Sequence, residues 1–319
     1  MKKGLYMISE KPIKILKRCY TGIVTKDKKY YIGTSTSSVY IYDYETTELV
    51  KRFSDVRYQD KLYLNEDNTL LVVKSTNPQI AVYDLKTLTL KHKIYVKGTS
   101  QPQGSNLCFS HCGNYLYNIV YDNDLLSFIL KIDLKDGSYK KINIPPFCVF
   151  TQILYVKEHK QYYLFGYERT SKYKSTDFIR CYNQDFKELK YIEIPNSYSQ
   201  VIYSPKEDLF YTRSISGYAI QVFRKNFKEV VKVYSSETKI KVIKGNHSQR
   251  EETHSIYSYS SGFSLNKNTL NIGIAYAEAI VIMNNDGKEL GVYPMSLGTV
   301  NLSNIDDELF LNGKIYKIT

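Results

Sequence analysis

One strand pattern recurs along the whole chain and constrains its fold more than any other feature. Each copy is a short strand of alternating apolar residues that ends in a polar residue and is followed by a polar turn. The copies occupy residues 39–43, 80–84, 129–133, 179–183, 220–224 and 280–284. Alternation with a period of two is typical of half-buried strands and not of helices. The chain is therefore predicted to be all-β and repetitive.

A second pattern, a pair of apolar strands joined by a polar turn, precedes each copy. The pairs are 22–24 with 30–33, 62–64 with 70–73, 107–109 with 115–117, 153–155 with 162–165, 201–203 with 209–211, 263–265 with 270–274, and 300–302 with 309–311. Together with a following outer strand, these elements give about four strands in a repeat of about 44 residues, which is the size of a β-propeller blade. The sequence predicts a single domain, 1–319, that forms a seven-bladed β-propeller with four antiparallel strands per blade.

The two ends of the chain are expected to share one blade. Residues 315–319 match the third strand of a blade, and no fourth strand follows them. The strand-like segment 13–17 can fill that place, because closing the ring with strands from both termini removes an open sheet edge. Residues 5–9 carry the same pattern as 315–319, and we assign the third-strand role to the C-terminal copy.

The ends of the third strands carry a family resemblance. Residues 82–87 (VYDLKT) and 40–43 (YIYD) resemble the end of a WD40 blade, with Tyr in place of its Trp; the chain has 32 Tyr and no Trp. The blades are also similar to those of YVTN-type propellers. The Gly-His dipeptide of WD40 blades is absent, so the resemblance does not extend to the His–Asp network of that family. It implies a fold and little about function, because propellers host many functions.

Charge and composition disfavour several function classes. The net charge is +12, but only eight of the 44 basic residues are Arg, the residue that nucleic-acid sites favour. No apolar run is long enough to span a membrane, and the basic start has too short an apolar stretch for an export signal. The five Cys show no zinc-like spacing. We expect a cytoplasmic monomer without metal or cofactor.

Loop variation is expected to mark the binding face. The first-to-second and third-to-fourth strand turns are short, whereas segments 97–104, 168–177 and an insertion at about 235–261, between blades 5 and 6, are irregular and should project to the opposite face. Function concentrates in such loops on rigid scaffolds. The residues predicted to bind a partner are Arg169, Lys172, Tyr173, Lys174, Lys244, His247, Arg250, His254 and Tyr257. The basic residues among them favour an acidic protein partner or a polyanion.

Two other interpretations stay open. On a helix, His247, Glu251 and His254 would share one face and could ligate a metal or act as acid and base, although the segment matches no metal motif. The second is a lactonase-like or other hydrolytic enzyme, or a small-ligand sensor, that uses the central channel. The polar residues expected along the channel are Thr21, Asp60, Asn106, Gln152, Gln200, Ser261 and Asn301. Because these channel residues are mostly neutral, a non-enzymatic scaffold is the preferred interpretation.

Overall fold

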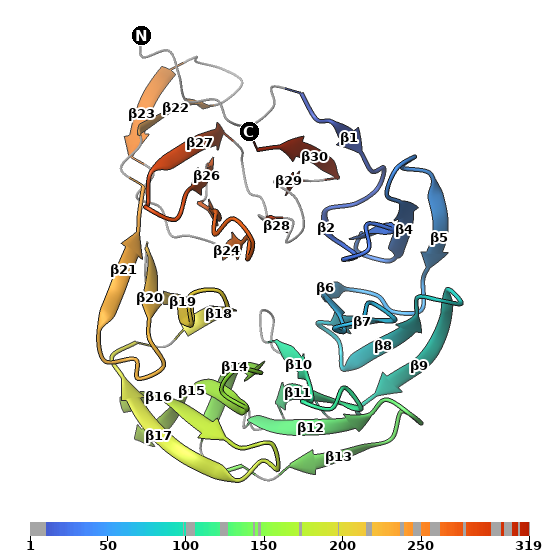
Figure 1. Ribbon diagram of the computed structural model, residues 1–319, viewed down its shortest axis with the longest axis vertical. Coiled ribbons are helices and arrows are strands. Elements are labelled where there is room, and N and C mark those ends of the chain that lie inside the picture. The colour runs from blue at the N-terminus through green and yellow to red at the C-terminus, as the bar shows by residue number, and fades with distance from the viewer. Residues whose placement is uncertain are drawn as a thin grey trace.

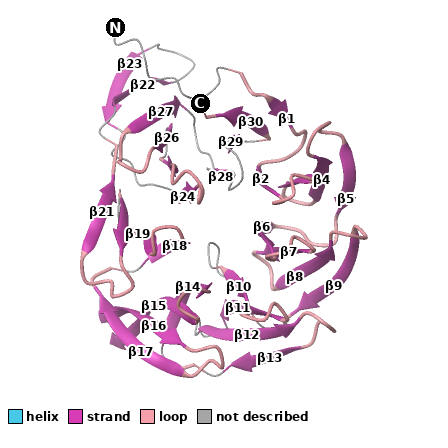
Figure 2. Cartoon of the chain, viewed as in Figure 1, coloured by secondary structure: helices cyan, strands magenta, loops and turns pink. Residues whose placement is uncertain are grey.

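The computed structural model shows seven four-stranded antiparallel sheets arranged around a central axis, which confirms the seven-bladed β-propeller (Figure 1). It describes residues 11–97, 99, 106–121, 127–142, 144–145, 148–171, 174–196, 198–214, 219–236, 239–244, 250–255, 262–276, 279–294, 301–302, 308–311 and 313–318. In these residues only strands and loops occur (Figure 2). None of the described segments is a helix long and apolar enough to cross a membrane.

Each blade runs outward from the axis in chain order. Blade 1 consists of β2 (Thr21–Val24), β3 (Tyr30–Thr34), β4 (Val39–Asp43) and β5 (Leu49–Phe53). Blade 2 consists of β6 (Gln59–Leu64), β7 (Leu70–Ser75), β8 (Gln79–Asp84) and β9 (Thr89–Tyr95). Blade 3 consists of β10 (Leu107–Phe109), β11 (Tyr115–Tyr121), β12 (Ser127–Asp133) and β13 (Tyr139–Ile142). Blade 4 consists of β14 (Cys148–Val156), β15 (Gln161–Ser171), β16 (Lys174–Tyr182) and β17 (Glu188–Ile194). Blade 5 consists of β18 (Tyr198–Ser204), β19 (Leu209–Ser214), β20 (Ile220–Phe223) and β21 (Val230–Tyr234). Blade 6 consists of β24 (Gly262–Leu265), β25 (Ile272–Ala275), β26 (Ala279–Met283) and β27 (Glu289–Pro294).

Blade 7 contains strands from both ends of the chain, as predicted. Its order is β28 (Asn301–Leu302), β29 (Glu308–Leu311), β30 (Lys314–Lys317) and β1 (Lys14–Ile15). The N–H of Ile13 donates to the carbonyl of Ile315 at 2.7 Å, and the N–H of Leu16 donates to the carbonyl of Gly313 at 2.7 Å. The competing segment 5–9 lies outside the described residues.

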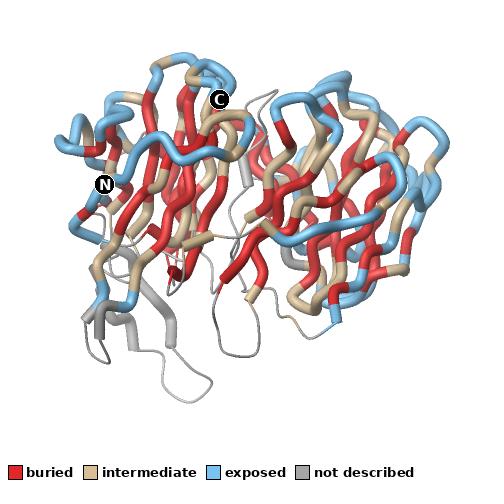
Figure 3. Tube along the Cα trace, turned by 90° about the horizontal axis from the view of Figure 1, so that it is seen from below, coloured by how far each residue is buried: buried red, intermediate tan, exposed pale blue. Residues whose placement is uncertain are grey.

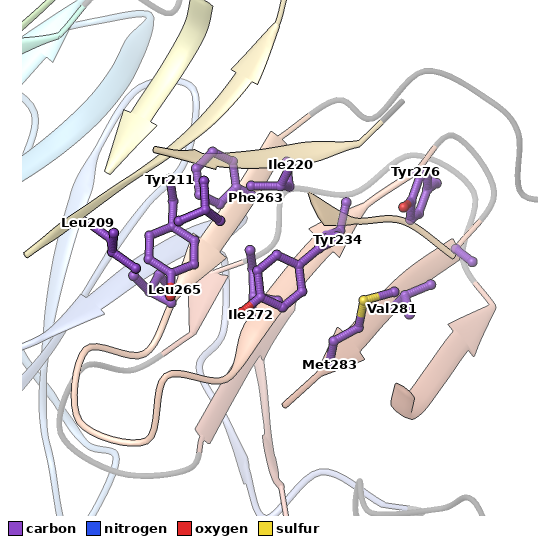
Figure 4. Packing of buried hydrophobic residues seen from close by; sticks show 13 residues of the cluster. Leu209, Tyr211, Ile220, Tyr234, Phe263, Leu265, Ile272, Tyr276, Val281 and Met283 are labelled. Carbon is purple, nitrogen blue, oxygen red and sulfur yellow. The ribbon is translucent and has the colours of Figure 1, made fainter. Parts of the chain in front are cut away.

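The core lies between the faces of neighbouring blades. The second and third strands are buried along most of their length, whereas the outer strands and turns are exposed (Figure 3). Between blades 5 and 6, for example, Tyr211 and Tyr234 pack with Ile272, Val281 and Met283 (Figure 4). Each blade therefore packs on both faces, and strands such as β3 and β4 are buried on both sides, whereas the alternation of their residues predicted half-buried strands.

The short turns are as uniform as the sequence indicates. In six blades the first-to-second turn holds one residue with positive φ: Lys28, Asn68, Gly113, Lys160, Asp208 and Leu270. A glycine would adopt this left-handed conformation without strain, yet only one of the six is glycine. The repeated geometry thus persists although the sequence at the turn varies.

Most outer strands contain one extra residue relative to the third strand that they pair with. The extra residues are Val50 in β5, Lys91 in β9, Leu189 in β17, Val231 in β21 and Leu290 in β27. Such bulges disturb the exposed edge and discourage pairing with a further strand. The outer strand of blade 3, β13, pairs with β12 over four consecutive residues without a bulge.

The insertion between blades 5 and 6 forms an antiparallel pair, β22 (Lys239–Lys244) and β23 (Arg250–Ser255), as a separate two-stranded sheet. Glu251 and His254 lie in register opposite Ile243 and Ile240. The helical arrangement considered for a metal or acid–base site is therefore wrong for this segment, because residues three apart alternate faces on a strand.

Candidate functional site

The structure places five of the predicted partner-binding residues in two extensions. Arg169 is exposed on β15, and Lys174 begins β16. Lys244 and Arg250 pair in register where β22 ends and β23 begins, and His254 pairs with Ile240 further along. Lys172, Tyr173, His247 and Tyr257 lie outside the described residues. Second-to-third and blade-to-blade connections leave a propeller at the same end, so both extensions belong to one face, hereafter the loop face.

The central channel opens toward the other end of the ring. Its cavity is about 1260 Å³, and residues of the first strands and of the first-to-second turns line it. The lining includes the aromatic side chains of Tyr63, Tyr155 and Tyr203, and charged residues of the turns, among them Lys26 and Lys267. A cavity of this size can hold a small polar molecule.

The amide side chains predicted for the channel instead connect neighbouring blades. Asn106 Oδ1 accepts a hydrogen bond from the N–H of Ile153 at 2.5 Å, which joins blades 3 and 4. Gln152 Nε2 donates to the carbonyl of Ser199 at 2.9 Å, which joins blades 4 and 5. The amide groups in these hydrogen bonds are already bound to the backbone of the next blade, so their main role is to hold neighbouring blades together and not to bind a ligand.

Gln200 makes the strongest of these connections. Its Nε2 donates to the carbonyl of Phe263 at 2.6 Å, and its Oε1 accepts from the N–H of Phe263 at 3.0 Å. One side chain thus replaces a pair of strand hydrogen bonds between blades 5 and 6. Of the other predicted channel residues, Thr21 is half-buried, Ser261 lies outside the described residues, and the side chains of Asp60 and Asn301 are not among those described.

Charged turn residues surround the channel mouth. Lys26 Nζ donates to the carbonyl of Glu66 at 2.8 Å, and the Glu66 carboxylate forms an ion pair with Lys157 Nζ at 2.9 Å. These contacts connect the turns of blades 1, 2 and 4. The hydrogen bond and charge of Glu66 raise the pKa of Lys157, and those of Lys157 lower the pKa of Glu66. Both side chains are largely exposed, so salt screens the pair.

Lys267 is a further turn lysine that lines the channel mouth, and it makes no ion pair with a described carboxylate. Its side chain reaches water, but protein atoms of the channel surround it, and this partial desolvation lowers its pKa. Glu158 opposes the effect and Lys26 adds to it. A small anion in the channel would meet Lys267, together with Lys26 and Lys157, at the mouth.

A His–Asp–Tyr cluster, which was not predicted from the sequence, joins the turns of blades 4 and 5. His159 Nδ1 lies 2.7 Å from the hydroxyl of Tyr163, and its Nε2 lies 2.6 Å from Asp208 Oδ1. The Tyr203 hydroxyl also donates to Asp208, at 2.9 Å. Burial raises the pKa of Tyr163, so its hydroxyl stays protonated and inaccessible as a nucleophile. We therefore interpret the cluster as a connection between blades 4 and 5.

The side chains that the structure describes contain no group of three or more His, Cys, Asp and Glu residues that could hold a metal ion. The five Cys are free thiols: Cys19, Cys148 and Cys181 are buried, Cys108 is half-buried, and Cys112 is exposed in a turn. Cys108 lies on β10, and Cys112 lies in the turn that follows it.

Comparisons with known proteins show likeness in fold. No protein-family model matches the sequence, and no curated protein sequence matches it. Among solved structures, the β-propeller domain of Myceliophteria thermophila Cps50 (Swd1) is similar with a TM-score of 0.66 and 8% identity, over 98% of this chain and 99% of that one. Kuenenia stuttgartiensis hydrazine synthase is similar with a TM-score of 0.69 and 11% identity, over 100% of this chain and 99% of that one.

Proposed function

We propose that this seven-bladed propeller of WD40-like fold is a non-enzymatic scaffold that binds a protein partner through its loop face. The observation that carries the proposal is how the polar side chains are used. Asn106, Gln152 and Gln200 near the axis all bind the backbone of the next blade. The ring is thereby held rigid, while the loop face carries the extensions β15–β16 and β22–β23 and the exposed Arg169. Rigid scaffolds with variable loops are typical binding platforms.

The partner is expected to be acidic. Four of the five predicted residues that the structure describes on the loop face, Arg169, Lys174, Lys244 and Arg250, are basic, and the whole chain has a net charge of +12. Complementary charge accelerates association and selects against basic partners.

The test compares two charge-reversed variants with the wild type. In the first, Arg169, Lys174, Lys244 and Arg250 are replaced by Glu. In the matched control, four exposed lysines of the third-to-fourth turns at the opposite end are replaced by Glu: Lys86, Lys135, Lys187 and Lys225. Cross-linked complexes from host cells are compared by mass spectrometry. Loss of a wild-type partner in the first variant alone supports the proposal; equal retention by both refutes it.

A second candidate function, sensing of a small anion in the channel, is favoured by Lys267. Its ammonium lies at the channel mouth, and the cavity also offers aromatic walls. Thermal melts with phosphate, citrate and nucleoside monophosphates test this idea. A rise in Tm that Lys267→Met abolishes supports it, and a rise that persists in the variant places the ligand elsewhere.

A further inference from the structure

The outer edge of blade 3 differs from the other outer edges in its geometry. Strand β13 pairs with β12 in an uninterrupted register, Ile129 opposite Ile142 to Ile132 opposite Tyr139. The outer strands of blades 1, 2, 4, 5 and 6 are each interrupted by a bulge. Among these described outer strands, β13 therefore presents the regular edge that an added strand requires.

The direction of its backbone groups follows from one hydrogen bond at the turn between β12 and β13. The N–H of Asp133 donates to the carbonyl of Ser138 at 2.8 Å. In an antiparallel ladder, hydrogen-bonded and non-hydrogen-bonded pairs alternate. Residues 140 and 142 therefore direct their backbone groups toward β12, and Tyr139 and Lys141 direct theirs toward the open edge.

The side chains around this edge are basic and aromatic. Lys140 and Lys141 are exposed, Tyr139 is 46% exposed, and neither lysine forms an ion pair with a described carboxylate. Lys141 Nζ lies 3.9 Å from the centre of the Phe128 ring, which keeps its charge beside the strand.

Blade 2 adds to this positive charge. His92 Nε2 lies 3.0 Å from the carbonyl of Leu134, so β9 lies beside the end of blade 3. Strand β9 carries the exposed Lys91 and Lys93 and no acidic residue. The nearby Asp133 and Asp136 accept hydrogen bonds from N–H groups of their own turn.

We propose that the outer edge of β13 binds an extended acidic segment of a partner protein, which adds to blade 3 as a fifth strand. This surface is separate from the loop face, so the inference goes beyond the proposed function. The outward backbone groups of Tyr139 and Lys141 hold the strand, and the lysines of β9 and β13 meet its carboxylates. The lysines also keep two copies of this edge apart, because like charges repel. A nucleic acid has no peptide backbone to pair with the strand edge, and a flat membrane fits poorly against the convex outer wall of the ring seen in Figure 1.

The probe is a fluorescein-labelled peptide of alternating Val and Glu, with a Val–Lys peptide as the charge control. Fluorescence anisotropy is measured with wild type, Lys140→Glu/Lys141→Glu, Lys140→Gln/Lys141→Gln, Lys141→Ala and Lys141→Pro. The Ala variant removes the charge at position 141, and the Pro variant removes in addition the outward N–H without touching the ladder. Circular dichroism and Tm show that each variant is folded.

The expected results separate the two contributions. Wild type binds the Val–Glu peptide and not the Val–Lys peptide, and its affinity falls as salt rises. The double Glu variant loses at least tenfold in affinity and the double Gln variant loses less. Lys141→Pro binds about fivefold more weakly than Lys141→Ala, the effect of one hydrogen bond.

Three results would overturn the inference. Equal affinity of Lys141→Pro and Lys141→Ala excludes strand addition. Undiminished peptide binding by the double Glu variant excludes a contribution of Lys140 and Lys141 to the affinity. Binding of oligothymidine more tightly than the peptide, with loss in the double Glu variant, assigns the edge to a nucleic acid. Peptide binding should persist in the loop-face variant, which keeps this inference independent of the proposed function.

Discussion

Replacing Gln200 with Leu removes the side chain that joins blades 5 and 6 through two hydrogen bonds. Its amide spans the N–H and the carbonyl of Phe263, a residue that is 2% exposed. Leu has a similar volume and leaves both backbone groups of Phe263 without this partner. The variant therefore isolates the polar connection between two blades from their apolar packing.

The magnitude follows from the two bonds. Each intramolecular hydrogen bond contributes about 1 kcal/mol net, and a buried group left without a partner costs about 1–3 kcal/mol. We expect Gln200→Leu to lower the free energy of unfolding by about 2–4 kcal/mol. Asn106→Leu, which removes one such bond to Ile153, should cost about half as much.

Urea unfolding provides the assay. The chain has 32 Tyr and no Trp, so tyrosine fluorescence reports on the whole ring and circular dichroism checks the transition. Gln200→Glu gives a pH control. The Phe263 carbonyl favours the protonated carboxyl and so should raise its folded-state pKa, which means that stability is recovered at acidic pH and lost as pH rises through that pKa. A change of less than about 0.5 kcal/mol in Gln200→Leu would refute the role of this side chain in joining the blades.

Three further predictions test other parts of the ring. Leu16→Ala should cost about 2–4 kcal/mol in urea unfolding, because the side chain is buried beside the closing strand; a loss below about 1 kcal/mol would show that closure contributes little. Burial raises the pKa of Asp208, but hydrogen bonds from Tyr203 and His159 outweigh it, and the net pKa is lowered. The stability that this carboxylate contributes is present above about pH 4 and is lost as pH falls through its folded-state pKa. Asp208→Asn should therefore reduce the fall of Tm at acidic pH, and an unchanged fall would contradict this. Partial burial raises the pKa of Cys112, but hydrogen bonds within its turn lower it overall, so one thiol should react rapidly with a disulfide reagent at neutral pH, and Cys112→Ser should abolish that phase.

The repeat pattern predicted the architecture because each blade buries both faces. Alternating apolar residues located the inner three strands of all seven blades, and the missing fourth strand after residue 319 pointed to the segment 13–17, which contains β1. The bulges were not predicted. An extra residue such as Val50 or Val231 depends on how the outer strand bends around its blade, and the local alternation of residues does not contain that information.

The contacts between blades were harder to predict than the blades. Gln200 and Phe263 are far apart in the sequence, and only the closed ring brings the first strands of adjacent blades side by side. The same holds for His159 and Asp208. One signal was available: both residues lie in first-to-second turns, which a propeller places at one end. On the loop face, both the segment 168–177 and the insertion were expected to be irregular, whereas the structure shows the ends of β15 and β16 in the first and the pair β22–β23 in the second.

Tyrosine in place of tryptophan on the third strands changes what these positions can do. Tyr83 is fully buried, yet its hydroxyl reaches Asp55 Oδ2 at 3.2 Å, in the segment that follows the outer strand of the previous blade. The hydroxyl of Tyr42 donates to the carbonyl of Lys17, in the segment that leads from the closing strand into blade 1. An indole N–H also donates, but it lies at a different place on the ring from the phenol hydroxyl, so Trp would need a different packing to make these contacts. The phenol therefore combines core packing with a polar link to the adjoining blade, which is the same principle by which Gln200 and His159 hold this ring together.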